Sequence, residues 1–253
     1  KDWDGAKALV DSELDQLKIE ENDIDYFVVN HMEPDHTGAI VDIVKKNPNA
    51  KILCSKKAVP LIEAFYGIKE NIQVVEDGET LDLGEKTLQF FMTPNVHWPE
   101  TMMTYLIEDK ILFSCDAFGA YGIYKNSFDD QLTEKEWALL LPETERYFAN
   151  IISSFSAFCE KAIKKLESVD VSIICPSHGI IWRKNPEKAI GLYSKLASYA
   201  KGKREKEITI VWSSMYGNTK AILDSFIDGV ESVPGVKCYV FQVPQTHESF
   251  ILE

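Results

Sequence analysis

A short segment near the start of the chain places two histidines and two carboxylates within six positions: His31, Glu33, Asp35 and His36. The apolar run 26–29 before it predicts a buried strand, and a helix is expected over about residues 37–46. Imidazole and carboxylate groups are metal ligands, and the end of a strand presents them on a rigid scaffold. On its own the segment is equally compatible with a polar turn capped by Asp35.

Three further side chains follow predicted strands in the same way. His97 comes just after the strand expected over 86–92, Asp116 follows 111–114, and His178 follows 171–174. The chain has only five histidines, so four of the five occupy such positions. One histidine at a strand end would more often be a hydrogen-bonded structural residue, but four together with three carboxylates predict a two-metal site.

The donor set restricts the metal. Four imidazoles and three carboxylates without a thiolate suit iron, manganese or zinc. In two-metal sites the ions lie roughly 3.5–4 Å apart, and a carboxylate can bridge them. Asp116 is the residue that we expect to form this bridge.

Composition bounds the class of protein. In 253 residues the apolar share is 45% and the charged share 26%, which is ordinary for a globular chain. A net charge of −13 argues against a nucleic-acid partner. The five cysteines form no Cys-x-x-Cys pair, which favours reduced thiols in a cytoplasmic protein. No apolar run is long enough to cross a membrane, and no signal peptide is evident.

Hydrophobic periodicity predicts an α/β chain. A first layer alternates helices and strands: helix 5–17, strand 25–30, helix 37–46, strand 51–54, helix 58–66 and strand 72–75. A β-rich stretch and a helical stretch follow: strands 80–84, 86–92, 102–107 and 111–114, loop 116–131, helix 143–166, strand 171–174 and helix 186–199. We expect the metal site to lie in this part, residues 1–200.

A charged segment, 201–207, predicts a linker to a second domain over 208–253. There the chain resumes as strand 208–212, loop, helix 219–231 and strand 236–241. The loop could hold a phosphate with its backbone N–H groups, its hydroxyls and the helix N-terminus: Ser213, Ser214, Met215, Tyr216, Gly217, Asn218 and Thr219. The alternative is an ordinary strand-to-helix turn with a serine cap. His247 is expected in a surface loop without a role.

Together these motifs resemble the ligand series of the metallo-β-lactamase superfamily, which has an αββα sandwich fold. Hydrolases of that superfamily generally carry histidine where this chain has Glu33. The segment 208–253, with its loop 213–219, resembles the start of a flavodoxin. Glu33 and this flavodoxin-like segment together make the chain similar to the flavodiiron proteins, also named A-type flavoproteins. The resemblance implies that His31, Glu33 and His97 hold one iron, that Asp35, His36 and His178 hold the other, and that Asp116 bridges them. It also implies that loop 213–219 binds the phosphate of FMN.

Flavodiiron proteins reduce dioxygen to water or nitric oxide to nitrous oxide. The resemblance therefore implies an oxidoreductase that receives electrons through FMN from a rubredoxin-like donor, in a head-to-tail homodimer or a dimer of such dimers. Trp98 and Tyr121 either line its pocket or pack against it. Two departures suggest a fragment truncated at both ends. Only two strands follow residue 207, whereas a flavodoxin-like sheet needs about five, and the family's N-terminal β-rich segment is not seen before Lys1.

Two other functions remain open from the sequence. One is a dizinc hydrolase of the metallo-β-lactamase type, in which a metal-bound hydroxide attacks the substrate. Glu33 and the flavodoxin-like segment argue against it. The other is a flavodoxin-like electron-transfer protein whose metal site is only structural, and the complete set of candidate ligands argues against that.

Overall fold

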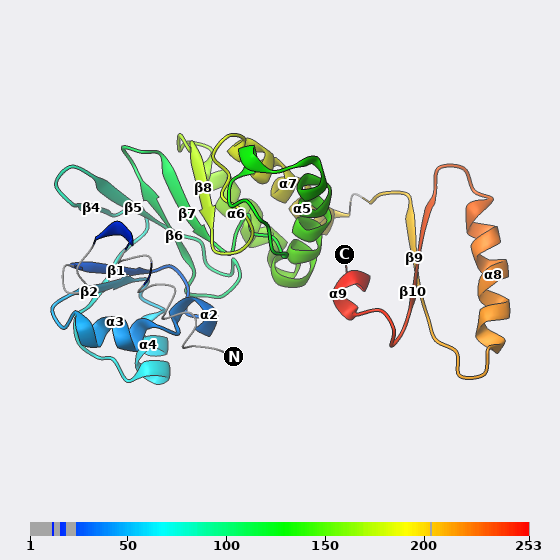
Figure 1. Ribbon diagram of the computed structural model, residues 1–253, viewed down its shortest axis with the longest axis horizontal. Helices are drawn as coiled ribbons and strands as arrows, with labels where there is room; N and C mark the ends of the chain where they lie inside the picture. Colours follow the sequence, from blue (N-terminus) through cyan, green and yellow to red (C-terminus); the bar gives the residue numbers. More distant parts are fainter. Residues whose placement is uncertain (1–11, 13–15, 19–23, 203, 253) are drawn as a thin grey trace.

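The computed structural model describes residues 12, 16–18, 24–202 and 204–252 (Figure 1). The helix expected over 5–17 lies largely outside these residues. Among the described residues, no helix is both long enough and apolar enough to cross a membrane.

The first sheet contains three parallel strands in the order β1 (Tyr26–Val29), β2 (Lys51–Cys54) and β3 (Ile72–Val74). Helices α3 (Ile40–Lys46) and α4 (Val59–Tyr66) connect these strands. A proline near its start favours α4, and Gly67 ends it with a φ of +69°, a left-handed conformation that suits glycine. The predicted alternation of strands and helices is confirmed, although the helix expected from residue 37 begins at Ile40.

The second sheet has five strands in the order β4 to β8: β4 (Thr80–Asp82), β5 (Thr87–Met92), β6 (Met102–Leu106), β7 (Ile111–Cys115) and β8 (Ile173–Pro176). Neighbouring strands are antiparallel from β4 to β7, whereas β8 runs parallel to β7. It follows that β5, β7 and β8 all point in one direction, so their carboxyl ends meet at the same edge of the sheet.

Three main helices cover the outer face of this sheet: α5 (Glu134–Tyr147), α6 (Ser156–Leu166) and α7 (Pro186–Ser198). The helix predicted over 143–166 was wrong at its start and in its continuity. The observed helix α5 starts nine positions earlier than predicted, at Glu134, because the Thr133 hydroxyl and the Glu136 side chain form a capping box there. Between α5 and α6 the chain passes through a π-helix, η2 (Phe148–Ile152), and a 3-10 turn, η3 (Ser153–Phe155).

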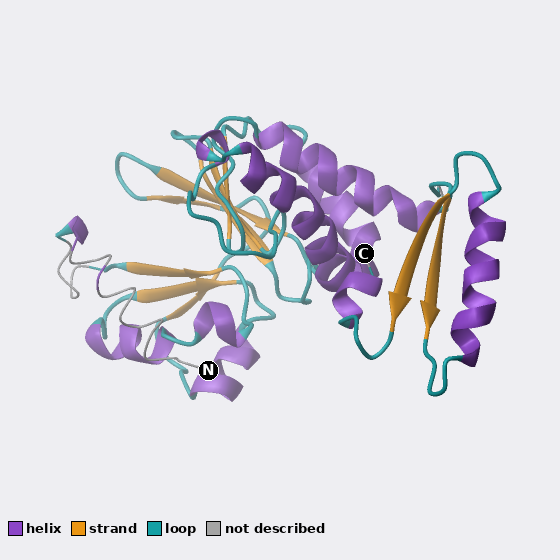
Figure 2. Cartoon of the chain, turned by 45° about the vertical axis from the view of Figure 1, so that its right-hand side comes forward, coloured by secondary structure: helices purple, strands orange, loops and turns teal. Residues whose placement is uncertain are grey.

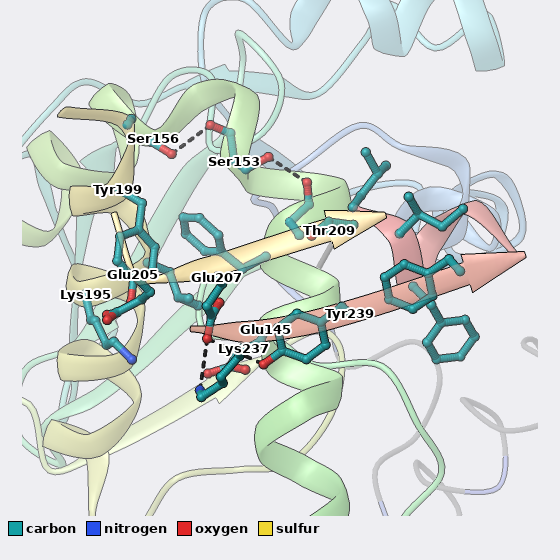
Figure 3. A pocket seen from close by; sticks show the side chains of 18 residues that line it. Glu145, Ser153, Ser156, Lys195, Tyr199, Glu205, Glu207, Thr209, Lys237 and Tyr239 are labelled. Atoms are coloured by element: carbon teal, nitrogen blue, oxygen red, sulfur yellow. Dashed lines mark hydrogen bonds and ion pairs between the residues drawn. The ribbon is translucent and has the colours of Figure 1, made fainter. Parts of the chain in front are cut away.

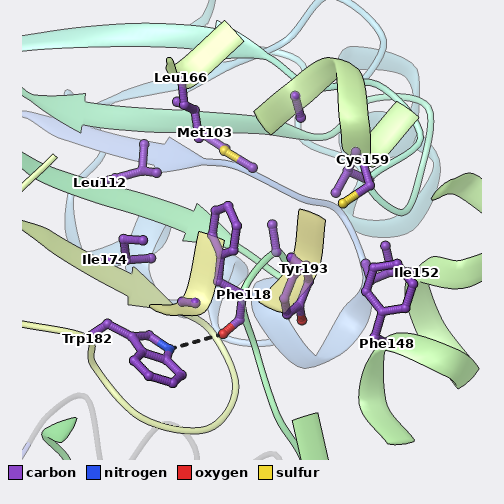
Figure 4. Packing of buried hydrophobic residues seen from close by; sticks show 14 of the residues in the cluster. Met103, Leu112, Phe118, Phe148, Ile152, Cys159, Leu166, Ile174, Trp182 and Tyr193 are labelled. Atoms are coloured by element: carbon purple, nitrogen blue, oxygen red, sulfur yellow. Dashed lines mark hydrogen bonds between the residues drawn. The ribbon is translucent and has the colours of Figure 1, made fainter. Parts of the chain in front are cut away.

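The hydrophobic contacts define four layers, helices–sheet–sheet–helices, which are visible in Figure 2. One cluster joins β1 and β2 to α3 and α4, and a second, around Leu53, Phe90 and Met102, fills the space between the two sheets. The largest cluster packs the second sheet against α5 to α7 and includes Phe118, Trp182 and Tyr193 (Figure 4). The αββα sandwich expected from the resemblance is therefore the observed architecture.

The C-terminal strands β9 (Glu207–Trp212) and β10 (Lys237–Gln242) and helix α8 (Asn218–Glu231) lie to one side of this sandwich (Figure 1). The two strands are parallel, and α8 connects them. The short helix α9 (Glu248–Ile251) returns to α5, where Arg146 donates a hydrogen bond to Ser249 Oγ (2.9 Å). A cavity separates β9 and β10 from the helices, and its lining includes Glu145, Lys195 and Tyr239 (Figure 3).

Candidate metal centre

The seven candidate ligands meet because of the strand directions. His97, Asp116 and His178 follow β5, β7 and β8, whose carboxyl ends lie at one edge of the second sheet. The first sheet joins this edge through the main-chain hydrogen bond from Met102, at the start of β6, to Asn30 at the end of β1 (2.9 Å).

The segment after β1 is not the polar turn that the sequence allowed. Its second half forms a short helix, α2 (Pro34–Thr37), which contains Asp35 and His36. Glu33 occupies the N-cap position without a side-chain capping bond, so the alternative of a turn capped by Asp35 is wrong. Within this helix Oδ2 of Asp35 lies 3.5 Å from Nε2 of its sequence neighbour His36.

The first group contains His31, Glu33 and His97, together with one oxygen of Asp116. Glu33 Oε2 lies 3.2 Å from His31 Nε2 and 3.0 Å from His97 Nε2. Asp116 Oδ2 lies 3.4 Å from His31 Nε2 and 3.5 Å from His97 Nε2. Two imidazole nitrogens and two carboxylate oxygens thus face one small volume.

The second group contains Asp35, His36 and His178. His178 Nε2 lies 3.3 Å from Asp35 Oδ2. The other oxygen of Asp116, Oδ1, lies 3.1 Å from His36 Nε2 and 3.3 Å from His178 Nε2. Asp116 therefore presents one oxygen to each group, as a bridging carboxylate would.

These distances fit a pair of metal ions. Around an ion with bonds of about 2.1 Å to nitrogen and oxygen, neighbouring donor atoms lie about 3.0–3.4 Å apart. The separations above run from 3.0 to 3.5 Å. Hydrogen bonds would also have such lengths, but His36 Nε2 is buried and, despite its 3.1 Å approach to Asp116 Oδ1, makes no hydrogen bond of acceptable geometry with any described residue. A buried nitrogen without a hydrogen-bond partner suits a metal ligand.

The electrostatics of the cluster favour cations. Burial, the largest influence, would raise the pKa of Asp116, but His178, His36 and His97 hold this pKa far below its usual range. Burial lowers the pKa of His36 and of His97, yet the surrounding carboxylates raise both above the ordinary value. In both cases Asp116 is the strongest of the raising partners. The cluster thus stabilises added positive charge.

The candidate ligands differ in their exposure to solvent. The side chains of His31 and Asp116 are 0% and 1% exposed and form its floor. Those of Asp35, Glu33 and His178 are 49%, 37% and 37% exposed. A small molecule can therefore reach the centre past the second group and Glu33.

Two buried residues that contact the centre were missed from the sequence. Glu100 Oε1 lies 2.7 Å from His31 Nδ1, and the hydroxyl of Tyr147 lies 3.3 Å from Asp116 Oδ1. Glu100 stands only three positions after His97, which could have drawn attention to it. No sequence signal connects Tyr147, on α5, with Asp116.

The two neighbouring aromatic residues differ in role. The ring of Trp98 meets that of His31 edge-on, with 5.0 Å between centroids. Tyr121 packs against Tyr147 at 5.0 Å and lies under the guanidinium of Arg146. Trp98 thus contacts the candidate ligand His31 directly, whereas Tyr121 contacts Tyr147, which in turn is hydrogen-bonded to Asp116. His247 is the N-cap of α9, where Nδ1 accepts a hydrogen bond from Ser249 N–H (3.2 Å), so it has a structural role that the sequence did not suggest.

The predicted phosphate loop joins β9 to α8. Gly217 has a φ of +86° and serves as the N-cap of α8, with no side-chain capping bond. Ser214 Oγ accepts a hydrogen bond from the Gly217 N–H (2.9 Å), while Met215 and Tyr216 are both 85% exposed. The uncapped first turn of a 14-residue helix leaves N–H groups that could receive a phosphate.

The four-layer fold, with a cluster of histidines and carboxylates at one sheet edge, defines a metallo-β-lactamase-like α/β protein. A sequence profile described as "ODP family beta lactamase" matches residues 8–179, about two thirds of the chain. The chain belongs to this family.

Named relatives are similar over almost the whole chain. The anaerobic nitric oxide reductase flavorubredoxin of Escherichia coli O1:K1 / APEC is 38% identical over 240 residues, which are 93% of this chain and 49% of that protein. A flavo di-iron protein from Thermotoga maritima superposes with a TM-score of 0.86 at 32% identity, over 98% of this chain and 62% of that one. Rubredoxin oxygen:oxidoreductase from Desulfovibrio gigas superposes with a TM-score of 0.84 at 30% identity, over 94% of this chain and 60% of that one. The expected resemblance to flavodiiron proteins is confirmed. The chain spans about half the length of the curated relatives that it matches.

Proposed function

We propose that the protein is a flavodiiron oxidoreductase that reduces dioxygen to water, nitric oxide to nitrous oxide, or both. The observation that carries this proposal is the position of Asp116, whose two carboxylate oxygens face two separate groups of candidate ligands. The similarity to nitric oxide reductase flavorubredoxin and to rubredoxin oxygen:oxidoreductase supports it.

In this proposal, His31, Glu33 and His97 hold one iron, and Asp35, His36 and His178 hold the other. Asp116 bridges the pair. When bound, a pair of non-haem irons supplies one-electron redox chemistry and open coordination positions for a small gas molecule. Three carboxylates offset part of the charge of two divalent ions, and this suits a metal pair that changes oxidation state.

The protein residues have distinct tasks around the pair. Buried His31 and Asp116 fix the floor of the centre and exclude water from that side. The hydroxyl of Tyr147 donates a hydrogen bond to Asp116 Oδ1 and so limits rotation of the bridging carboxylate. Burial and the charge of Asp116 raise the pKa of Tyr147 far above its ordinary value, so this proton stays on the phenol oxygen.

We further propose that the chain contains two domains, over 1–200 and 208–253, with a linker over 201–207. The second would be the start of a flavodoxin-like FMN domain, with the FMN phosphate bound by loop 213–219. The parallel β9–α8–β10 unit and the uncapped start of α8 support this. Electrons would come from a rubredoxin-type protein, as the names of the two relatives suggest for those proteins. A head-to-tail homodimer and a cytoplasmic location complete the proposal, and five free cysteines agree with a reducing compartment.

The proposal is tested by measuring iron, zinc and flavin in the purified full-length protein. We expect two irons and one FMN per chain, followed by consumption of dioxygen or nitric oxide when the protein is reduced under anaerobic conditions. Two zinc ions without flavin would overturn the proposal in favour of a hydrolase. Flavin without any metal would indicate an electron carrier instead.

A further inference from the structure

Glu100 is a buried carboxylate whose position the proposed chemistry does not yet explain. It lies on the loop between β5 and β6 that also carries His97, and it is 2% exposed. Its main-chain oxygen accepts a hydrogen bond from the hydroxyl of Ser55 (2.6 Å), which ties this loop to the end of β2. Burying a carboxylate is costly unless it is hydrogen-bonded, so its partners indicate what the residue does.

One oxygen of Glu100 has two partners in the first metal-binding segment. Oε1 lies 2.7 Å from His31 Nδ1 and 3.0 Å from the Met32 nitrogen, whose N–H it accepts. Because an ionised carboxylate can only accept hydrogen bonds, Nδ1 of His31 is the donor.

The direction of this hydrogen bond fixes what His31 offers to the centre. A neutral ring with its proton on Nδ1 carries a lone pair on Nε2. That atom lies 3.2 Å from Glu33 Oε2 and 3.4 Å from Asp116 Oδ2. A lone pair facing two carboxylates is unfavourable unless a cation lies among them, so the Glu100 contact orients His31 as a metal ligand.

The same support is not given to the other candidate histidines. Among the contacts between described residues, His36, His97 and His178 approach carboxylates only through Nε2. His31 is also enclosed by the ring of Trp98 and has the Thr101 hydroxyl 3.5 Å from Nδ1. Among the described residues, His31 is therefore the candidate histidine whose Nδ1 contacts a buried carboxylate.

We propose that Glu100 is a positioning residue of the metal centre. It holds His31 in the Nδ1–H tautomer with Nε2 directed at Glu33 and Asp116, and it thereby raises the metal affinity of the His31 half alone. This inference rests on the proposed metal centre. Carboxylates that hold ligating histidines in this way typically contribute 10- to 100-fold to metal affinity.

The test compares the binding of ferrous iron by full-length variants, measured under anaerobic conditions by competition with a chromophoric chelator. We expect Glu100→Leu to bind one of two ions about 10- to 100-fold more weakly and the other unchanged. Glu100→Gln keeps an oxygen acceptor for both N–H groups and is expected to retain most of the affinity. If Glu100→Leu fails to fold, Glu100→Asp serves instead, since its shorter side chain withdraws the carboxylate from Nδ1.

A double-mutant cycle separates positioning from general stabilisation. In a His31→Ala background, Glu100→Leu should cause no further loss of affinity, because the residue acts through His31. Asp129→Asn is the control, because Asp129 is a buried carboxylate outside the candidate ligand groups and should leave both affinities unchanged.

Three outcomes contradict the inference, and they differ in what they overturn. Wild-type affinities in Glu100→Leu, or an equal further loss in the His31→Ala background, would overturn the role of Glu100 alone. A wild-type protein that does not bind two ions would overturn the metal centre and, with it, this inference.

Discussion

Replacing Asp116 with asparagine tests the bridging geometry directly. The change keeps the size of the side chain but removes its charge and turns one oxygen into an amide nitrogen. In the native chain Oδ2 faces His31 and His97, and Oδ1 faces His36 and His178, all within 3.5 Å. Asp116→Asn therefore leaves each group with its three other candidate ligands but without the anion that they share.

The size of the effect follows from the charges. Glu33, Asp35 and Asp116 contribute three negative charges against four positive charges of two divalent ions, so the substitution raises the net charge of the centre from about +1 to about +2. A unit charge and a divalent ion about 4 Å apart attract by about 8 kcal/mol at an effective dielectric constant of 20. Even half of this value is about 4 kcal/mol, or about a thousandfold in affinity. We expect the variant to bind one ion tightly and to lose the second.

The assay is metal stoichiometry after dialysis against micromolar ferrous iron without oxygen, with circular dichroism to confirm folding. Asp129→Asn makes the same chemical change at a buried aspartate outside the candidate ligand groups, and should retain two ions. If Asp116→Asn also retains two ions with unchanged affinity, Asp116 does not bridge and the charge argument is wrong.

Three further substitutions test the scaffold. Asp129 accepts hydrogen bonds from the main-chain N–H groups of residues 183–185. Burial would raise the pKa of Asp129, but these hydrogen bonds lower it below the ordinary value. Asp129→Ala should therefore reduce the free energy of unfolding, measured in urea at neutral pH, by about 3 kcal/mol. Because the pKa of Asp129 is depressed in the folded state, this stabilisation is complete above about pH 4 and is lost as the pH falls through the folded pKa. Plots of unfolding free energy against pH should therefore converge in acid for the native protein and Asp129→Ala. Parallel plots would contradict the role given to the Asp129 carboxylate. Thr133→Ala removes the cap of α5 and should cost about 1 kcal/mol in thermal unfolding, whereas an unchanged melting temperature would show that the cap is dispensable. Arg146→Ala removes the hydrogen bond to Ser249 and the contact with Phe250 at 4.5 Å, so amide hydrogen exchange over 248–251 should accelerate, and unchanged protection would mean that α9 is held by other contacts.

The convergence of the candidate ligands was predictable because two simple signals coincide. Each of His97, Asp116 and His178 lies within five positions of the end of an apolar run that predicts a strand, and histidine is rare elsewhere in the chain. The sequence could not supply the strand order, however. The meeting of β5, β7 and β8 at one edge depends on an antiparallel meander followed by a parallel β8, and that order is a property of tertiary pairing.

The helical errors have local causes. Pro142 lies inside α5, where it removes a backbone donor, so apolar periodicity alone starts the helix after it. The capping box at Thr133 was present in the sequence and would have placed the true start. The π-helical segment after Tyr147 has no comparable signal, because its extra residue per turn is accommodated by packing of Phe148 and Ile152 in the core.

The supporting residues show where sequence reasoning ends. A ligand is recognised by its type and by its position after a strand, but a residue that acts through a ligand is recognised only by its distance from that ligand. Glu100 is 69 positions from His31 in sequence, and 2.7 Å separates Oε1 from Nδ1 in the fold. This contact makes the two halves of the centre unequal, since the buried ring of His31 is held by Glu100, whereas Asp35 and His178 are partly exposed. Both halves can be reached from solvent, because Glu33 is as exposed as His178, so we expect the His31 half to retain its ion longer only because Glu100 holds its ligand in place.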